Sequence, residues 1–233
     1  MIKELALSSP GEIRNLKRSV LGVGRSTPHL GRKFYHFAMG IFCVALYAFF
    51  LTQKQALMVL GSVGGIFLLL DFFRLRNPSL NALTLKYFGK IMRREELKSI
   101  SGNSFYILGL LVLVLFFPKP VVLLSALYLA IGDPIAAVVG TRWGKTKLTS
   151  RKTWEGSLAN LLATGVTSFC FGLWFLNWNV PQALVLAFLG GIISTLVELI
   201  PLPLDDNFTI PVGSALFFSL LASVFPVLSA LYI

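Results

Sequence analysis

The sequence predicts an all-α polytopic membrane protein with about seven transmembrane helices and a cytoplasmic N-terminus. Of its 233 residues, 55% are hydrophobic and only 13% are charged, which is the composition of an integral membrane protein. The formal net charge of +11 could suggest a nucleic-acid partner. The basic residues, however, gather in loops on one side of the apolar segments, as the positive-inside rule requires, so we expect a bilayer and no nucleic acid.

Apolar runs place the seven spans near residues 34–52, 55–71, 104–118, 120–140, 158–176, 182–200 and 213–232. Several are shorter than the roughly 20 residues that cross a bilayer, so tilt or local thinning is expected. Seven Lys or Arg residues precede the first span, seven lie in residues 72–103 and five in residues 141–157, against Lys54 and Lys119 on the opposite side. This asymmetry predicts that the N-terminus and the basic loops face the cytoplasm.

The chain divides into two parts by composition. Residues 1–31 scatter basic side chains among Leu, Ile and Val, without the apolar core or cleavage site of a secretory signal. We expect this part to lie on the lipid headgroups as an interfacial segment. Residues 32–233 form the membrane-embedded domain.

Asp133 is the most informative residue, because it lies inside an apolar run, roughly 10 Å of helix from the polar end at Gly140. A carboxylate at that depth needs a cation, a metal or backbone donors, so it predicts a functional site. Pro134 has no N–H and Asp is a preferred N-cap. Gly132-Asp133-Pro134 therefore predicts a broken helix whose restarted half points N–H groups at an anion.

A short basic loop follows the predicted break. Its GTRWGKT stretch differs from a phosphate-binding P-loop, because three residues instead of four separate the glycines. Small residues at intervals of four, including Gly140 and Gly144, predict either close helix packing or close approach of a ligand. Glycines and lysines together still favour phosphate. The candidates are Gly140, Gly144, Lys145, Lys152 and Thr153.

Other polar residues mark the same membrane face. Arg32 and His36 share one face of the first span near Lys33, although basic side chains that snorkel to the interface would give the same pattern. Asp71 and Arg74 have the spacing of a local ion pair. The stretch from Ser101 to Ser104, with Asn103, predicts a helix cap open to a phosphate.

Acidic residues gather where almost everything else is basic. Asp205-Asp206-Asn207 offers the hard oxygen ligands that suit Mg²⁺, although a plain polar turn is the alternative. Six of the ten acidic residues lie in or beside spans on this face: Asp71, Asp133, Glu155, Glu198, Asp205 and Asp206.

Together these motifs resemble the CTP-dependent lipid kinases, a family that includes yeast-type diacylglycerol kinase, dolichol kinase and phytol kinase. The resemblance rests on Arg32-Lys33 with His36, on Asp71 to Arg76, on GDPIAAVVGTRWGK with KTWEGS, and on Glu198 with DDNFTIP. The GD…GK…KTWEG block is also similar to the phosphatidate cytidylyltransferases. The KD, HGG and DR.D elements of those enzymes are absent here, and the extra spans of larger dolichol kinases are missing.

The resemblance implies transfer of the terminal phosphoryl group of CTP to a lipid alcohol of the diacylglycerol, phytol or polyprenol type, with Mg²⁺ as cofactor. Metal ligands would be Asp133, Asp205, Asp206 and Asn207. Nucleotide phosphates would meet Arg32, Lys33, Asn103, Gly140, Gly144, Lys145, Lys152 and Thr153. Asp133, Glu155, Glu198 and His36 are the catalytic candidates, with the roles of the two glutamates left open.

Two alternatives remain at this point. A CTP-dependent cytidylyltransferase would make a CDP-lipid from the same nucleotide. A transporter or lipid-binding protein would also carry buried carboxylates and a broken helix, but it would often show a second break, and the sequence has neither that nor an internal repeat. The sequence leaves the oligomeric state open.

Overall fold

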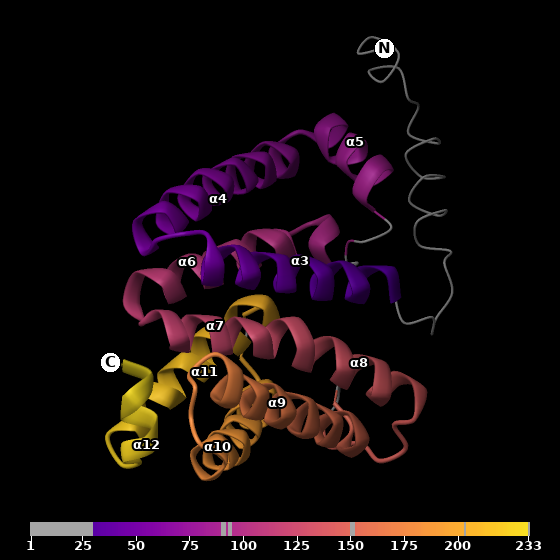
Figure 1. Ribbon diagram of the computed structural model, residues 1–233. Helices are drawn as coiled ribbons and strands as arrows, with labels where there is room; N and C mark the ends of the chain where they lie inside the picture. The colour runs from indigo at the N-terminus through magenta and orange to yellow at the C-terminus, as the bar shows by residue number, and fades with distance from the viewer. Residues whose placement is uncertain (1–29, 90–91, 93–94, 150–151, 203, 233) are drawn as a thin grey trace.

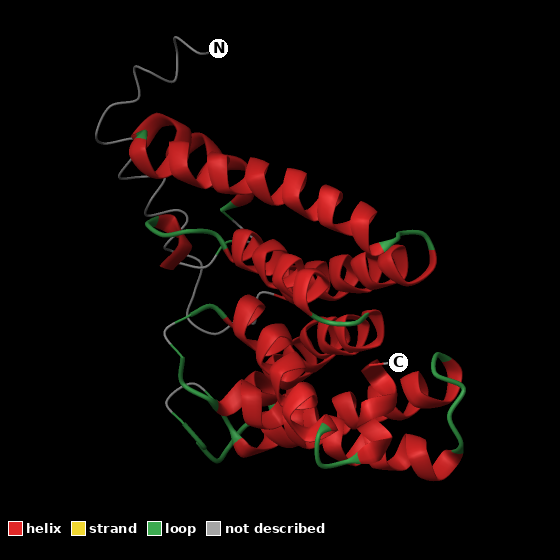
Figure 2. Cartoon of the chain, turned by 90° about the vertical axis from the view of Figure 1, so that its left-hand side faces the viewer, coloured by secondary structure: helices red, strands yellow, loops and turns green. Residues whose placement is uncertain are grey.

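The computed structural model describes residues 30–89, 92, 95–149, 152–202 and 204–232. In these ranges the regular structure is helical, apart from one isolated antiparallel bridge between Lys147 and Thr153 (Figure 2). The predicted all-α fold is therefore confirmed. The predicted interfacial segment lies, up to residue 29, outside the described residues.

The long helices are α3 (Leu30–Phe49), α4 (Gln53–Arg76), α5 (Pro78–Phe88), α6 (Gly102–Phe116), α7 (Lys119–Leu127), α8 (Asp133–Arg142), α9 (Trp154–Trp174), α10 (Val180–Leu199) and α11 (Asp206–Ala222). The short elements are η1 (Glu95–Leu97), η2 (Tyr128–Gly132), α12 (Pro226–Ser229) and η3 (Ala230–Tyr232). Figure 1 shows α4 and α5 on one side of α3, and α7, α8, α9 and α10 on the other.

Four helical runs in the described residues are long and apolar enough to cross a membrane. They are Gln53–Arg76, Lys119–Arg142, Trp154–Trp174 and Val180–Leu199, and the shorter apolar helices are Lys33–Phe49, Gly102–Phe116 and Asp206–Ala222. The chain is thus a helical membrane protein. A helix overlaps each predicted span, while seven crossings and their direction stay predictions.

The last span differs most from its predicted bounds of 213–232. Its helix α11 already begins at Asp206, because Asp205 takes the N-cap position and its side chain accepts from the N–H of Asn207. The helix ends at Ala222, and Pro226 then opens the short α12. The acidic triplet therefore starts a helix instead of forming a loop between two spans.

The predicted break at Gly132-Asp133-Pro134 is wrong. Helices α7, η2 and α8 form one helical run, in which Gly132 has φ −63° and ψ −56° and Asp133 has φ −59° and ψ −46°. The N–H of Asp133 donates to the carbonyl of Tyr128, five residues earlier, so η2 is a π turn. A π turn absorbs the missing N–H of Pro134 within the helix. Asp133 consequently caps no helix, and no free helix start faces a ligand here.

The stripe of small residues on α8 packs against α9. A Cβ atom on Gly144 would lie 2.7 Å from Thr153 Oγ1, and one on Gly156 would lie 2.9 Å from the carbonyl oxygen of Ala136. At Gly132 the space is filled by the Oδ1 atom of Asn160. Of the two predicted reasons for the stripe, the structure shows close helix packing.

Candidate functional site

Charged side chains from four helices and one loop meet at one end of the membrane domain. Lys33 of α3 pairs with Asp133 of α8, with 2.6 Å between Nζ and Oδ2. Lys152, in the loop before α9, pairs with Glu198 of α10 at 2.7 Å. Its Nζ also lies 3.7 Å from the Oδ2 atom of Asp206, at the start of α11. We call these five residues the charged cluster.

The two ion pairs are close enough to interact electrostatically, as the pKa of Lys152 shows. Burial alone would lower the pKa of Lys152, but nearby carboxylates outweigh it and raise this pKa above its ordinary value. In decreasing order of effect, these carboxylates are those of Glu198, Asp206 and Asp133. Three carboxylates therefore act on one ammonium group, which stays charged at neutral pH.

Several oxygen atoms beside the cluster are buried without a hydrogen-bond partner among the described residues. They are Glu198 Oε2, Asn160 Oδ1 and Ser157 Oγ. Asn160 is only 1% exposed, its Nδ2 atom donates to Ser194, and its Oδ1 lies against Gly132, next to Asp133 in the chain. Unpaired buried oxygens are costly, so they suit a site that a cation or a hydroxyl group completes.

Glu155 and Glu198, which the sequence could not separate, have different surroundings. The Oε1 atom of Glu155 accepts from the backbone N–H groups of Lys145 and Thr146, at 2.9 and 3.2 Å. It thereby holds the loop between α8 and α9 in shape. Glu198, in contrast, is 7% exposed and faces Lys152 with one oxygen, while its other oxygen has no hydrogen-bond partner in the part of the chain that the structure describes.

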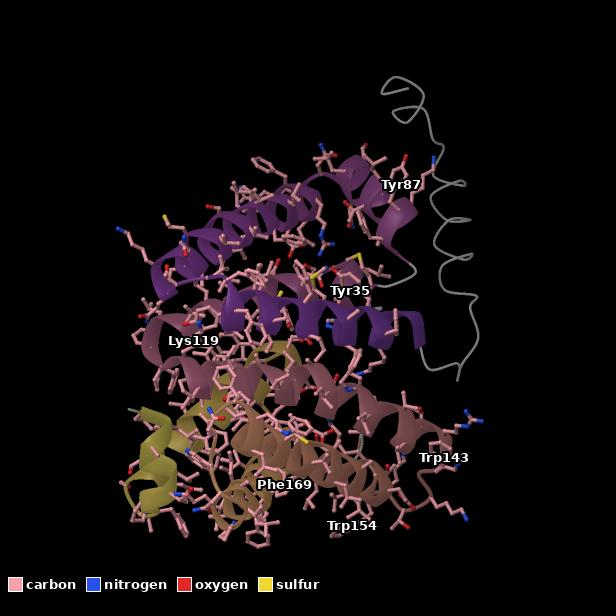
Figure 3. All side chains as sticks on the ribbon, viewed as in Figure 1. Tyr35, Tyr87, Lys119, Trp143, Trp154 and Phe169 are labelled. Atoms are coloured by element: carbon pink, nitrogen blue, oxygen red, sulfur yellow. The ribbon has the colours of Figure 1, made fainter. Side chains whose placement is uncertain are left out.

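The predicted phosphate ligands of the basic loop have different surroundings in the structure. Thr153 is buried and its hydroxyl accepts from the N–H of Gly156, so it caps α9. Gly140 and Gly144 pack against that hydroxyl, which accounts for both glycines without a phosphate. Lys145 is exposed, whereas Lys152 reaches the charged cluster. Figure 3 shows Trp143 and Trp154 near this loop, at the end of the domain opposite to Lys119.

The start of α6 is a helix cap, as predicted, but a protein carboxylate fills it. Asp71 Oδ2 accepts from the backbone N–H and hydroxyl of Ser101 and from the hydroxyl of Ser104, at 2.8, 3.0 and 2.7 Å. The predicted ion pair is also present, since Arg74 Nε donates to Asp71 Oδ1 at 2.6 Å. Asn103, in the first turn of α6, is half-buried.

The remaining candidates are Asp205, Asn207, His36 and Arg32. Asp205 caps α11, and the amide nitrogen of buried Asn207 donates to the carbonyl of Gly102, which ties α11 to α6. The ring of His36 meets those of Tyr35 and Tyr106 edge to face, with centroids 5.9 and 6.2 Å away. The side chain of Arg32 lies outside the described part of the chain.

The residue that sequence reasoning missed is Asn160. A signal existed, because polar residues recur along α9 at helical spacing, although this span is otherwise apolar. Those that are buried are Ser157, Asn160, Thr164 and Ser168. Such a stripe in a membrane helix faces the protein interior, which could have singled out Asn160 before the fold was known.

Comparisons with known proteins give consistent names. The chain is 32% identical over 213 residues to CTP-dependent diacylglycerol kinase 1 of Saccharomyces cerevisiae, covering 83% of this chain and 73% of that protein. Identity to CTP-dependent diacylglycerol kinase 1 of Eremothecium gossypii is 34% over 206 residues, 80% and 65% of the two chains. Phytol kinase 1, chloroplastic, of Arabidopsis thaliana is 27% identical over 201 residues, 80% and 64%. No family model and no solved structure matches the chain.

Proposed function

This chain belongs to the family of CTP-dependent lipid kinases, and we propose that it transfers the terminal phosphoryl group of CTP to the hydroxyl group of a membrane lipid alcohol. The acceptor is of the diacylglycerol, phytol or polyprenol type, and the products are a lipid phosphate and CDP. The observation that carries this proposal is the charged cluster, in which three carboxylates and two lysines meet at one end of a membrane domain.

The lysines bind the phosphates of the nucleotide. In the structure Lys33 and Lys152 each neutralise a carboxylate. Phosphate oxygens offer the same lysines several further acceptors, and the ammonium group is a point charge that can turn between partners. On nucleotide binding, each lysine exchanges its carboxylate for phosphate oxygens.

The carboxylates released by this exchange are hard oxygen ligands and fit Mg²⁺. Among the described residues, no group of three or more His, Cys, Asp or Glu side chains has the spacing of a metal site. Mg²⁺ is usually bound through one or two carboxylates plus substrate phosphates, so two carboxylates from the charged cluster are enough for this proposal. Asp133 and Asp206 would hold the ion, and the ion would neutralise charge on the transferred phosphoryl group.

Glu198 serves as the base. The lipid oxygen forms a bond to the terminal phosphorus, the bond from that phosphorus to the bridging oxygen of CDP breaks, and the lipid proton passes to a carboxylate. Glu198 suits this role because its buried Oε2 atom has no hydrogen-bond partner among the described residues. Glu155 does not, because its carboxylate accepts from the backbone of Lys145 and Thr146.

The site faces the cytoplasm in this proposal, and the alcohol enters sideways from the cytoplasmic leaflet. Support comes from the charge asymmetry of the loops, since the basic loop between α8 and α9 carries Lys152 into the cluster. A lipid alcohol can then reach Glu198 while its hydrocarbon chain stays in the bilayer.

Labelled CTP tests the proposal directly. With purified protein, Mg²⁺ and a lipid alcohol, CTP labelled at its terminal phosphorus should place the label on the lipid and release CDP. Cytidine recovered in the lipid fraction with release of pyrophosphate would instead identify a cytidylyltransferase. CTP labelled at its innermost phosphorus is the control, because a kinase leaves that label in the aqueous phase.

A further inference from the structure

An apolar cavity of about 80 Å³ lies toward the other end of the domain. It is bounded by α3, α4, α6 and α7, and none of the charged cluster contributes to it. Its lining includes Cys43, Tyr47, Ala56, Leu110, Leu123 and Ala126. Four of these are almost fully buried, so the cavity reaches into the core: Ala56, Leu110, Leu123 and Ala126.

Polar contacts fasten the helix ends beyond this cavity. The Nζ atom of Lys119 lies 5.0 Å from the centre of the Tyr47 ring and donates to the carbonyl of Leu51. The side chain of Gln53 donates to the carbonyl of Val114 at 2.7 Å. Tyr47, Leu51 and Val114 all line the cavity, so these contacts hold its far end in place.

Helix α3 connects the cavity with the charged cluster. Lys33 and Cys43 lie on this helix, and their separation of ten positions corresponds to about 15 Å at the helical rise. One leaflet of a bilayer is also about 15 Å deep, since the hydrocarbon core measures roughly 30 Å. A lipid chain that starts near Lys33 and Asp133 therefore ends near the cavity.

We propose that this cavity receives the far end of the hydrocarbon chain of the lipid alcohol, and that its held end limits the length of chain accepted. This inference rests on the proposed function. Lipid tails surround the protein with equally apolar groups, so burial alone gives the chain no preference for the cavity. Discrimination comes from shape, because a pocket with a fixed end distinguishes chains that differ by a methylene group or more.

Filling the cavity tests the inference. Ala126 is 2% exposed and lines the cavity, so Ala126→Leu places three further carbon atoms there. We expect kcat/KM for a long-chain alcohol to fall about tenfold or more, while a short-chain alcohol that ends before the cavity keeps its value. The matched control is Ala38→Leu, the same change at an exposed position of α3 outside the lining.

Enlarging the cavity should have the opposite effect. Leu60→Ala removes part of the lining on α4 and should shift the preference toward longer chains. Unchanged turnover of the short-chain alcohol shows in each variant that the protein is folded.

A direct readout uses an alcohol with a photoreactive group at the end of its chain. Crosslinks should fall in residues 43–51, 56–60, 110–114 or 122–126, and a group placed beside the hydroxyl should not label them. If all variants share one chain-length profile, or the end group labels only the exposed face of α4, the cavity inference is overturned while the kinase stands. If the wild type phosphorylates no alcohol, the proposed function fails, and this inference fails with it.

Discussion

Lys33 and Asp133 are 100 residues apart in the sequence, yet their Nζ and Oδ2 atoms lie 2.6 Å apart. Their side chains are only 15% and 11% exposed, so the pair is largely removed from solvent. Removing one partner of such a pair leaves a buried charge, while removing both does not. This difference allows stability and catalysis to be separated by experiment.

Asp133→Asn should lower turnover on the order of a thousandfold, because the change removes a proposed metal ligand worth about 4 kcal/mol in the transition state. It should also destabilise the fold, since Lys33 loses its partner. The double variant Lys33→Met with Asp133→Asn should regain thermal stability in detergent but no activity. Turnover near that of the wild type in Asp133→Asn would remove this residue from the mechanism.

Glu198→Gln should reduce kcat by roughly a hundredfold to ten-thousandfold, the usual effect of losing a general base, with little change in the KM for CTP. The control is Glu155→Gln, which keeps an oxygen acceptor for the N–H groups of Lys145 and Thr146. The kcat of that variant should stay within about fivefold of the wild-type value, since the hydrogen bonds remain and only the negative charge of their acceptor is lost. Steady-state kinetics with varied CTP distinguish the two, and equal losses would contradict separate roles.

Lys152→Met should raise the KM for CTP by about tenfold or more, because a phosphate ligand in a partly buried site is lost. Lys145→Met provides a control in the same loop, since Lys145 is exposed and lies outside the charged cluster. Binding of CTP to the purified protein, measured without lipid, checks the effect apart from turnover. If the two variants bind CTP equally well, Lys152 is not the phosphate ligand.

Asp71→Asn should affect the fold and leave the chemistry alone. The carboxylate of Asp71 accepts three hydrogen bonds at the start of α6 and pairs with Arg74, which is 3% exposed. A loss of about 3 kcal/mol in stability is expected, because Arg74 keeps a buried charge with no counterion. Thermal unfolding should show a lower melting temperature for Asp71→Asn. The control Asn103→Ala should melt at the temperature of the wild type. A tenfold rise in the KM for CTP in folded Asp71→Asn would instead assign this cap to the nucleotide.

Cysteine labelling tests the direction of the chain. In a background without Cys43 and Cys170, Ser79→Cys and Lys145→Cys should react with a membrane-impermeant reagent only from the cytoplasmic side. Lys54→Cys should react only from the opposite side. All three positions are exposed, so access is decided by the bilayer alone. Labelling of Lys145→Cys from outside would place the charged cluster on the wrong face.

The sequence predicted well those features that depend on residues close to each other along the chain. The helices follow from apolar runs, and the pair of Asp71 and Arg74 follows from a spacing of three residues on one helix. For Lys152 and Glu198 the sequence predicted only that both lie at the same membrane face. Their pairing requires the packing of α9 against α10, which the sequence does not show.

The failures have a common physical origin. A proline after a glycine and an aspartate is compatible with a broken helix or with a π turn, and both satisfy the missing N–H. In the structure the π turn places Gly132 against Asn160. These two residues are 28 positions apart, so the contact could not be seen in the local sequence. The role of Glu155 likewise depended on how the loop before it closes back on α9.

The π turn also sets the rotational phase of α8. It contains one residue more than an α-helical turn would need, and each residue of an α-helix turns the direction of its side chain by about 100°. Asp133 points toward Lys33 only because of that extra residue. Deleting one residue between Tyr128 and Gly132 would leave a continuous apolar helix of nearly the same length. The carboxylate would then be carried about a quarter turn away from α3, and the protein would keep its span while losing its charged cluster.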